Sequence, residues 1–249
     1  GGGKRYKAHA AGLQDTVLAL EEARRTAHPH AEIHSAPIFE GATEFPWLNK
    51  PLGIEHFAKH GKLGDDEVVV VIDADMLFMD TLDVAKHLER LLCTGGCPGK
   101  RWGGMSAREV AEGGLRRGRP LAQLYGIGGG WLTKFDLKAV FGRHSKAAAV
   151  TRDEAVQYFS VGPPYVMYAS DLKLLAPVWA EVMGKVLQTE KDILSDMWAY
   201  AMASAHLGFR HLAIDSMMLS NPKYPAGEAW TLDPSPWGGA PGGGGATCG

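Results

Sequence analysis

The apolar positions of the chain repeat with the period of helices in some segments and form short uninterrupted runs in others. Residues 13–20 carry apolar side chains at helical spacing and predict a helix near the N-terminus. A second helix is predicted to start at Asn49, because asparagine is favoured at helix N-caps, and to end at Gly61. Further helices are predicted over residues 82–92, after a Thr151–Glu154 capping box, from Ser170 with a kink or restart at Pro177, and over residues 192–207, where Gly208 ends the pattern.

One segment has the composition of a buried strand. Residues 68–72 form a continuous β-branched run, Val-Val-Val-Val-Ile, with no polar alternation. Such runs are typical of strands covered on both faces, so this segment is predicted to be a central strand. Shorter strand-like segments follow at residues 121–125, 165–168 and 209–214. The alternation of helices and strands favours an α/β fold, a layered sheet with helices on both faces.

Two carboxylates, Asp73 and Asp75, directly follow the predicted central strand. Because strand side chains alternate with a period of two, both point to the same side of the strand. Ligands of α/β sheets bind at the carboxyl ends of the strands. A carboxylate pair there suits a hard cation, which also takes diphosphate oxygens and would neutralise charge on a leaving nucleoside diphosphate. This segment is the strongest candidate for the chemistry of the protein.

Two other interpretations of the carboxylate pair stay open. The carboxylates can simply cap the following helix or form a turn. They can also belong to a haloacid-dehalogenase-type phosphatase, in which the first aspartate is the nucleophile and the second is the acid/base. Leu77 stands where that class usually has Thr or Val, and no later acidic pair is found, so the phosphatase is disfavoured.

Composition narrows the possible partners. The 249 residues include 26 basic and 28 acidic side chains, a net charge of −2 with no basic stripe, so nucleic acid is not an expected partner. No apolar run is long enough to cross a bilayer, and since the chain starts at Gly1 rather than at Met, we expect any membrane anchor to lie outside it.

We expect a domain over residues 8–224 and a Gly/Pro-rich disordered tail over residues 225–249. Cys93 and Cys97 can form a local disulfide or remain free thiols.

Five short segments together carry a resemblance that no one of them would carry alone. They are Asn49–Pro51, Val70–Met76, the stretch with Asp171-Leu172, Ala176-Pro177 and Trp179, the Asp196–Ala201 block, and Gly208–His211. In this order they resemble segments of the hydroxyproline O-arabinosyltransferases and peptidyl serine α-galactosyltransferases of plants and algae. Val70–Met76 resembles the galactosyltransferases, whereas Ala176-Pro177 resembles the arabinosyltransferases, so galactose and arabinofuranose both stay open as the donor sugar.

The resemblance implies a GT-A-like fold with Asp73 and Asp75 at the end of a central strand, a UDP-sugar donor, and dependence on Mn²⁺ or Mg²⁺. It implies transfer of the sugar to a serine or hydroxyproline hydroxyl of a Hyp-rich glycoprotein, in the lumen of the Golgi or ER. The non-enzymatic alternative is an inactive pseudo-transferase that binds UDP-sugar, because the chain starts at about the first helix of such a fold.

The same resemblance gives roles to individual residues. Asp196 matches the acidic position of its block and is the candidate catalytic carboxylate, which would stabilise charge at the sugar or orient the acceptor hydroxyl. A solvated helix face is the alternative for this residue. His211 is the candidate third metal ligand beside Asp73 and Asp75, with a purely structural role as the alternative. Arg210 would pair with the diphosphate or, alternatively, with a surface carboxylate.

Four further residues are candidates for substrate contacts. Asn49 and Lys50 are candidate donor-binding residues, through the Asn-Lys-Pro element of the resemblance. Trp131 follows the glycine run at residues 126–130, a candidate flexible active-site loop, and is a candidate acceptor-binding residue together with Trp198. The alternative for both tryptophans is a place in the core.

Overall fold

The structure of the chain is a computed structural model, and it describes residues 34–37, 39–42, 44–73, 76, 114–214 and 217–218. By its internal contacts the chain divides into two units, Gly1–Ile38 and Phe39–Gly249. Of the first unit only residues 34–37 are described, as irregular backbone. Outside the described residues lie Asp75, the helices predicted over 13–20 and 82–92, the three cysteines and the predicted tail.

Helices and strands alternate in the described part of the second unit, which confirms the predicted α/β class. The helices are the 3-10 helices η1 (Pro46–Leu48) and η2 (Lys146–Ala149), and α2 (Asn49–His60), α5 (Trp131–Lys134), α6 (Leu137–Phe141), α7 (Arg152–Tyr158), α8 (Ala169–Thr189) and α9 (Ser195–Leu207). The strands are β1 (Val68–Val71), β2 (Leu121–Leu124), β3 (Val161–Tyr168) and β4 (Leu212–Ile214). Among the described helices, none has the length and apolar character needed to cross a membrane.

The four strands form one mixed sheet in the order β1-β3-β2-β4. β3 is antiparallel to both β1 and β2, whereas β4 is parallel to β2. β1, with Asp73 just beyond its end, therefore lies at an edge of the described sheet. The prediction of a central strand buried on both faces is wrong for this sheet, because Val68 is 51% exposed and Val70 is 39% exposed. β-branched side chains favour a strand backbone whether or not both faces are covered, so the valine run overstated the burial.

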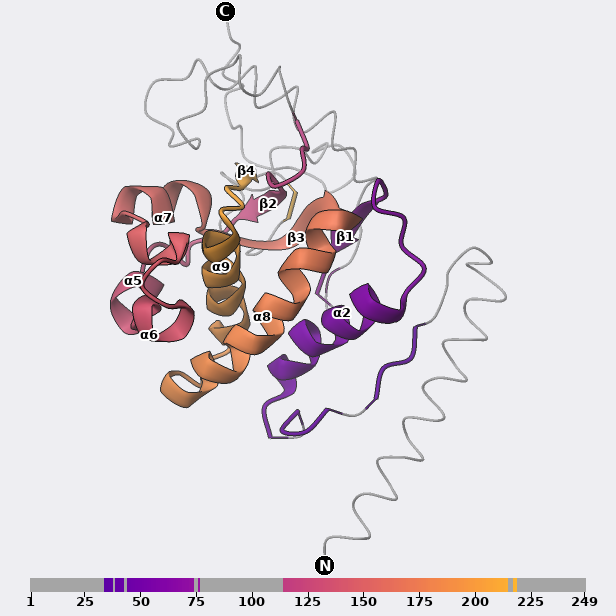
Figure 1. Cartoon of the computed structure of the whole chain (residues 1–249), viewed down its shortest axis with the longest axis horizontal. Coiled ribbons are helices and arrows are strands. Elements are labelled where there is room, and N and C mark those ends of the chain that lie inside the picture. The colour runs from indigo at the N-terminus through magenta and orange to yellow at the C-terminus, as the bar shows by residue number, and fades with distance from the viewer. Residues whose placement is uncertain are drawn as a thin grey trace, which may run out of the picture. The chain divides into compact units, whose positions relative to one another are not determined.

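α8 is the middle one of three helices that pack side by side next to the sheet. α8 contacts β1 and β3, α9 lies beside α8, and α2 packs along the other side of α8 (Figure 1). The start of α8 is fixed next to β1, because the N–H of Ala169 donates to the carbonyl oxygen of Glu67 at 2.7 Å. α8 continues through Pro177, where a kink or restart was expected. Val69 and Val71 pack against the core, while Val68 and Val70 of the same strand face away from it. Cover on both faces of the sheet and the GT-A-like fold stay predictions.

Helix ends agree with the sequence where a local capping motif defines them. Thr151 and Glu154 form the predicted capping box at the start of α7. Gly208 ends α9 in the left-handed conformation, with φ of 80°, as expected for a glycine after a helix C-terminus. These signals depend on a few neighbouring residues, so the sequence alone specifies them.

Two predicted helix starts are wrong. Leu48, and not Asn49, is the N-cap residue of α2, because η1 runs directly into this helix and the backbone is already helical at Leu48. α9 starts at Ser195, three residues later than predicted. Asp192 instead forms a turn before the helix, where its side chain accepts a hydrogen bond from the N–H of Leu194 at 3.3 Å.

Candidate functional site

The ammonium group of Lys50 lies between two carboxylates that are far apart in the sequence. Its Nζ is 2.6 Å from Asp73 Oδ1 and forms a second ion pair with Asp196 Oδ2. The side chains are 19% exposed at Lys50, 31% at Asp73 and 6% at Asp196. The Lys50–Asp73–Asp196 cluster therefore extends from the partly exposed end of β1 into the protein interior. It brings together three of the residues predicted for the site.

Each member of the cluster lies at the end of an element. Lys50 is the second residue of α2, Asp196 is the second residue of α9, and Asp73 lies two residues beyond β1. The helix dipole favours a carboxylate in the first turn of a helix and disfavours a lysine there. The place of Asp196 thus agrees with its own helix, whereas the place of Lys50 is explained by the two carboxylates that it contacts.

Burial and charge set the protonation of the cluster. Burial lowers the pKa of Lys50, but attraction and hydrogen bonds to Asp196 and Asp73 outweigh it and hold the pKa above its ordinary value. Burial raises the pKa of Asp196, and the opposing effect of Lys50 does not cancel it. The charge of Asp73 adds to the increase. Lys50 is therefore a firmly charged cation, and Asp196 is a carboxylate with increased affinity for a proton.

Aromatic rings support the buried end of the cluster. The indole N–H of Trp179 donates to the backbone carbonyl oxygen of Asp196 at 2.9 Å. Lys50 Nζ lies 6.0 Å from the centre of the same ring, within the range of a cation–π contact. Tyr165 packs edge-on against Trp179 and stacks on Tyr200, with ring centres 3.7 Å apart in the stacked pair. These rings limit how far the backbone of Asp196 can move.

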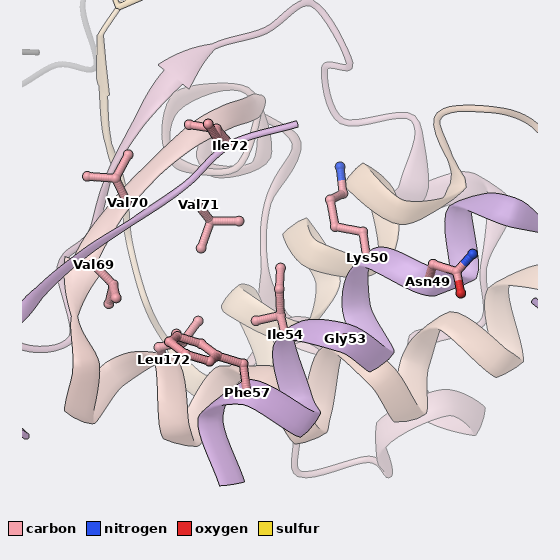
Figure 2. Close-up of a pocket in the computed structure, with 10 residues that line it drawn as sticks. All are labelled: Asn49, Lys50, Gly53, Ile54, Phe57, Val69, Val70, Val71, Ile72 and Leu172. Atoms are coloured by element: carbon pink, nitrogen blue, oxygen red, sulfur yellow. The ribbon is translucent and has the colours of Figure 1, made fainter. Parts of the chain in front are cut away.

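A groove of about 400 Å³ opens between α2 and β1, and Lys50 lies at one end of it (Figure 2). Figure 2 shows the apolar side chains of the groove directed into the space between helix and strand, and these include Ile54, Phe57, Val71 and Leu172. On the α2 side Gly53 leaves room, since a Cβ added there would meet no atom within 4 Å. The exposed Asn49 lines the groove beside Lys50. A groove of this volume can hold an organic ligand whose charged group reaches Lys50.

His211 is buried, and both of its ring nitrogens are hydrogen-bonded. Nδ1 is 3.0 Å from the carbonyl oxygen of Tyr158, and Nε2 is 2.9 Å from the hydroxyl of Tyr200. Because a carbonyl oxygen can only accept, Nδ1 carries the proton and Nε2 accepts from Tyr200. Burial lowers the pKa of His211 to about 4. This arrangement matches the structural alternative for His211, since neither nitrogen has a lone pair left for a metal ion.

A neutral buried histidine makes stability depend on pH. An unfolded histidine has a pKa of about 6.5, so between that value and about 4 the unfolded chain binds more protons than the folded one. Stability therefore falls as the pH is lowered, by about 2 kcal/mol between pH 7 and pH 5 from this group. We expect His211→Gln, whose amide can make both hydrogen bonds, to remove this part of the pH dependence. Urea unfolding of both proteins at the two pH values measures it, and equal pH dependence in the two would contradict it.

The remaining predicted residues lie away from the cluster. Arg210 forms an ion pair with Glu154, as in the surface-carboxylate alternative. Trp131 is 0% exposed at the start of α5, so the glycine run before it leads into the core instead of presenting an exposed ring. Trp198 is 6% exposed, and Lys134 Nζ lies 4.1 Å from the centre of its indole ring. Both tryptophans are core residues here, because large apolar side chains are stabilised by burial whatever loop precedes them.

Two buried polar residues were missed from the sequence. Gln123 is 0% exposed, and its Oε1 accepts hydrogen bonds from the N–H groups of Met217 and Met218, both at 2.9 Å. A glutamine within the otherwise apolar segment 121–124 is the signal that could have identified it. For Tyr165 the sequence predicts a strand residue that packs in the core or lines an acceptor groove, but no local pattern marks it as a neighbour of Asp73 and Asp196.

The described residues do not test the prediction of a metal site. No group of three His, Cys, Asp or Glu side chains that could hold a metal ion occurs among the residues that the structure describes. Asp73 suits one ligand position, since it is a partly exposed carboxylate at a strand end. Asp75 lies outside the described residues. Asp73 and Asp75 therefore stay the predicted metal ligands, whereas His211 uses both ring nitrogens in hydrogen bonds within the core.

Comparison with known proteins finds a distant relative of the chain that is a glycosyltransferase. The chain is similar to the peptidyl serine α-galactosyltransferase of Arabidopsis thaliana, with 25% identity over 189 residues that cover 70% of this chain and 19% of that protein. The chain therefore spans about a fifth of the length of the relative that it matches. No protein-family profile matches the chain, and no solved structure matches it. The similarity supports a glycosyltransferase function without specifying the donor, the acceptor or a metal.

Proposed function

We propose that this chain is a glycosyltransferase domain that moves a sugar from a UDP donor to a hydroxyl group of a Ser/Hyp-rich peptide. The observation that carries the proposal is the Lys50–Asp73–Asp196 cluster, a charged site at the end of an apolar groove. The relative is named for galactose and for serine, which favours galactose over arabinofuranose and a seryl acceptor. Such an enzyme would work in the lumen of the Golgi or ER.

In the proposed site, the cluster would bind the diphosphate of the donor and the groove would bind its nucleoside. Lys50 would bind the diphosphate, because its ammonium group lies at the end of the groove and is firmly charged. The apolar wall of the groove would take the flat uracil base, with Asn49 at its exposed rim. Asp73 and Asp75 would hold Mn²⁺ or Mg²⁺, which neutralises charge on the leaving diphosphate when it is bound.

Asp196 is the group best suited to act on the acceptor. In the transfer, the bond between the sugar anomeric carbon and the diphosphate oxygen breaks, and a bond from the acceptor oxygen to that carbon forms. The acceptor hydroxyl loses its proton in the same reaction. Because burial raises the pKa of Asp196, its carboxylate is a better acceptor of that proton than an exposed aspartate. Lys50 keeps this carboxylate charged until the substrates arrive.

The decisive experiment is a screen of UDP-sugars with a peptide that contains serine and hydroxyproline, with Mn²⁺ present and the product identified by mass. We expect UDP-galactose to give a product one hexose heavier than the peptide, and a peptide without hydroxyl side chains to give none. Metal-dependent UDP binding without turnover would instead indicate a pseudo-transferase. Hydrolysis of phosphomonoesters without any nucleotide sugar would indicate the phosphatase.

The role of Asp196 can be separated from donor binding by Asp196→Asn. This change keeps the shape of the side chain but removes its charge and its basicity. We expect UDP affinity to stay within about twofold and turnover to fall at least about tenfold, which corresponds to roughly 1.4 kcal/mol of transition-state stabilisation. Asp192→Asn, at the exposed turn before α9, is the matched control and should leave turnover unchanged. Equal losses of binding and turnover in Asp196→Asn would mean that the carboxylate is structural.

A further inference from the structure

Tyr165 carries a hydroxyl group that the fold does not use. The residue is 0% exposed, and its hydroxyl has no hydrogen-bond partner among the described residues. Tyr200, whose ring is stacked on that of Tyr165, is equally buried, but its hydroxyl is bonded to His211 Nε2 at 2.9 Å. A buried hydroxyl without a partner destabilises a protein, and phenylalanine would fill the same space without that cost. Packing therefore accounts for the ring of Tyr165 and leaves its oxygen unexplained.

Two independent features of the fold place Tyr165 beside the cluster. In the sheet Tyr165 pairs with Val71, the last residue of β1, and Asp73 follows two residues later along the chain. On α9, Asp196 and Tyr200 are four residues apart and share one face, and Tyr200 stacks on Tyr165. Tyr165 thus lies between the strand that carries one carboxylate and the helix face that carries the other.

The electrostatics of the pocket keep this hydroxyl protonated. Burial, followed by the neighbouring Tyr200 and the charges of Asp196 and Asp73, raises the pKa of Tyr165 well above its ordinary value. Tyr165 is therefore a neutral hydroxyl within electrostatic reach of both carboxylates. Trp179 contacts both residues, since its ring packs edge-on against the Tyr165 ring and its indole N–H donates to the backbone carbonyl oxygen of Asp196.

If Lys50 binds the diphosphate of a donor, as the proposed function requires, the phosphate oxygens compete with Asp196 for its ammonium group. The side chain of Asp196 is only 6% exposed, and without Lys50 its carboxylate keeps the backbone N–H of Met197 but loses its counter-charge in the interior, which is destabilising. We infer that the Tyr165 hydroxyl is the donor that replaces Lys50 on Asp196 when Lys50 turns to a bound ligand. Tyr165 is then a positioning residue, which holds the Asp196 carboxylate in place for the acceptor.

A double-mutant cycle in stability tests this inference independently of any enzymatic activity. Lys50→Met removes the ammonium group and leaves Asp196 to find another donor. We expect Tyr165→Phe to leave the urea midpoint unchanged or higher in the wild-type background, and to lower it in the Lys50→Met background. Tyr200→Phe, the stacked neighbour with a partnered hydroxyl, should lower the midpoint equally in both backgrounds. Equal effects of Tyr165→Phe in the two backgrounds overturn the inference.

Binding of UDP with Mn²⁺ provides the second arm and decides the question if Lys50→Met does not fold. Tyr165→Phe should weaken UDP binding about tenfold, the value of one hydrogen bond to a charged group, whereas Tyr200→Phe should not change it. Equal UDP affinity of wild type and Tyr165→Phe contradicts the inference and leaves the proposed function standing. A wild-type protein that binds no UDP refutes the proposed function, and the stability cycle then decides the role of Tyr165.

Discussion

Asp73→Ala and Asp75→Ala are each expected to weaken Mn²⁺-dependent UDP binding at least about a hundredfold while the protein stays folded. In the proposed site, either change removes one of the two carboxylates that would hold the metal ion. Asp73 is 31% exposed and belongs to no packed core, so its loss removes little buried area. Lys50 keeps Asp196 as a partner in the Asp73→Ala protein, which protects the cluster from collapse.

The effect of Asp73→Ala on UDP affinity should depend on whether the metal is present. In the presence of Mn²⁺, calorimetry should show the loss of affinity for UDP in both variants. With the metal chelated, Asp73→Ala should bind UDP as well as wild type or better, because Lys50 has one carboxylate fewer to leave. Asp192→Ala, which removes a carboxylate from the turn before α9, should change neither value. Unchanged affinity of Asp73→Ala with Mn²⁺ would leave Asp73 as a partner of Lys50 alone.

Local features of the fold could be predicted from the sequence, and long-range ones could not. The capping box at Thr151 and the stop at Gly208 depend on residues within one helical turn, and both are confirmed. The place of β1 in the sheet depends on which strands pair with it, and the valine run contains no information about that. The run shows the preference of valine for strand backbone and was taken to show burial on two faces.

In the candidate site, too, single residues could be predicted from the sequence, but the contacts between them could not. Lys50, Asp73 and Asp196 were each named from short segments, and the structure adds that one ammonium group contacts both carboxylates. Neither their spacing nor their neighbours indicates that contact, because it depends on how α2 and α9 pack around α8. The burial of His211 and Trp131 could not be predicted from the sequence either. A hydrogen-bonded core histidine has no sequence pattern that distinguishes it from a metal ligand, and a buried tryptophan has none that distinguishes it from a tryptophan that lines a groove.

The cluster also explains why a lysine at the start of a helix is retained against the helix dipole. Two carboxylates lie close to one cation, and one of them is nearly inaccessible to water. Without the cation, Asp196 would lose its ion pair in the interior, while Asp73 could turn to solvent. The stability of the fold and the readiness of the site for a ligand therefore depend on the same ammonium group.

Lys50→Met is accordingly expected to lower the free energy of unfolding by about 3 kcal/mol at neutral pH. Methionine keeps an unbranched apolar side chain of similar length, so the change isolates the charge from the packing of the groove. The loss should shrink as the pH is lowered. Burial already raises the pKa of Asp196, and without Lys50 the folded state binds that proton still more tightly than the unfolded chain. Protonation then favours the folded variant as the pH falls toward the ordinary range of aspartate.

Urea unfolding at two pH values, with three variants, separates this effect from a general loss of packing. Lys59→Met is the matched control, since Lys59 lies on the same helix and is 58% exposed in its ion pair with Glu55. That control should stay within about 0.5 kcal/mol of wild type. Adding Asp196→Asn to Lys50→Met should recover most of the stability, because the uncompensated charge is then gone. A Lys50→Met protein as stable as the Lys59→Met control, or one that Asp196→Asn does not rescue, would show that the buried carboxylate does not depend on Lys50.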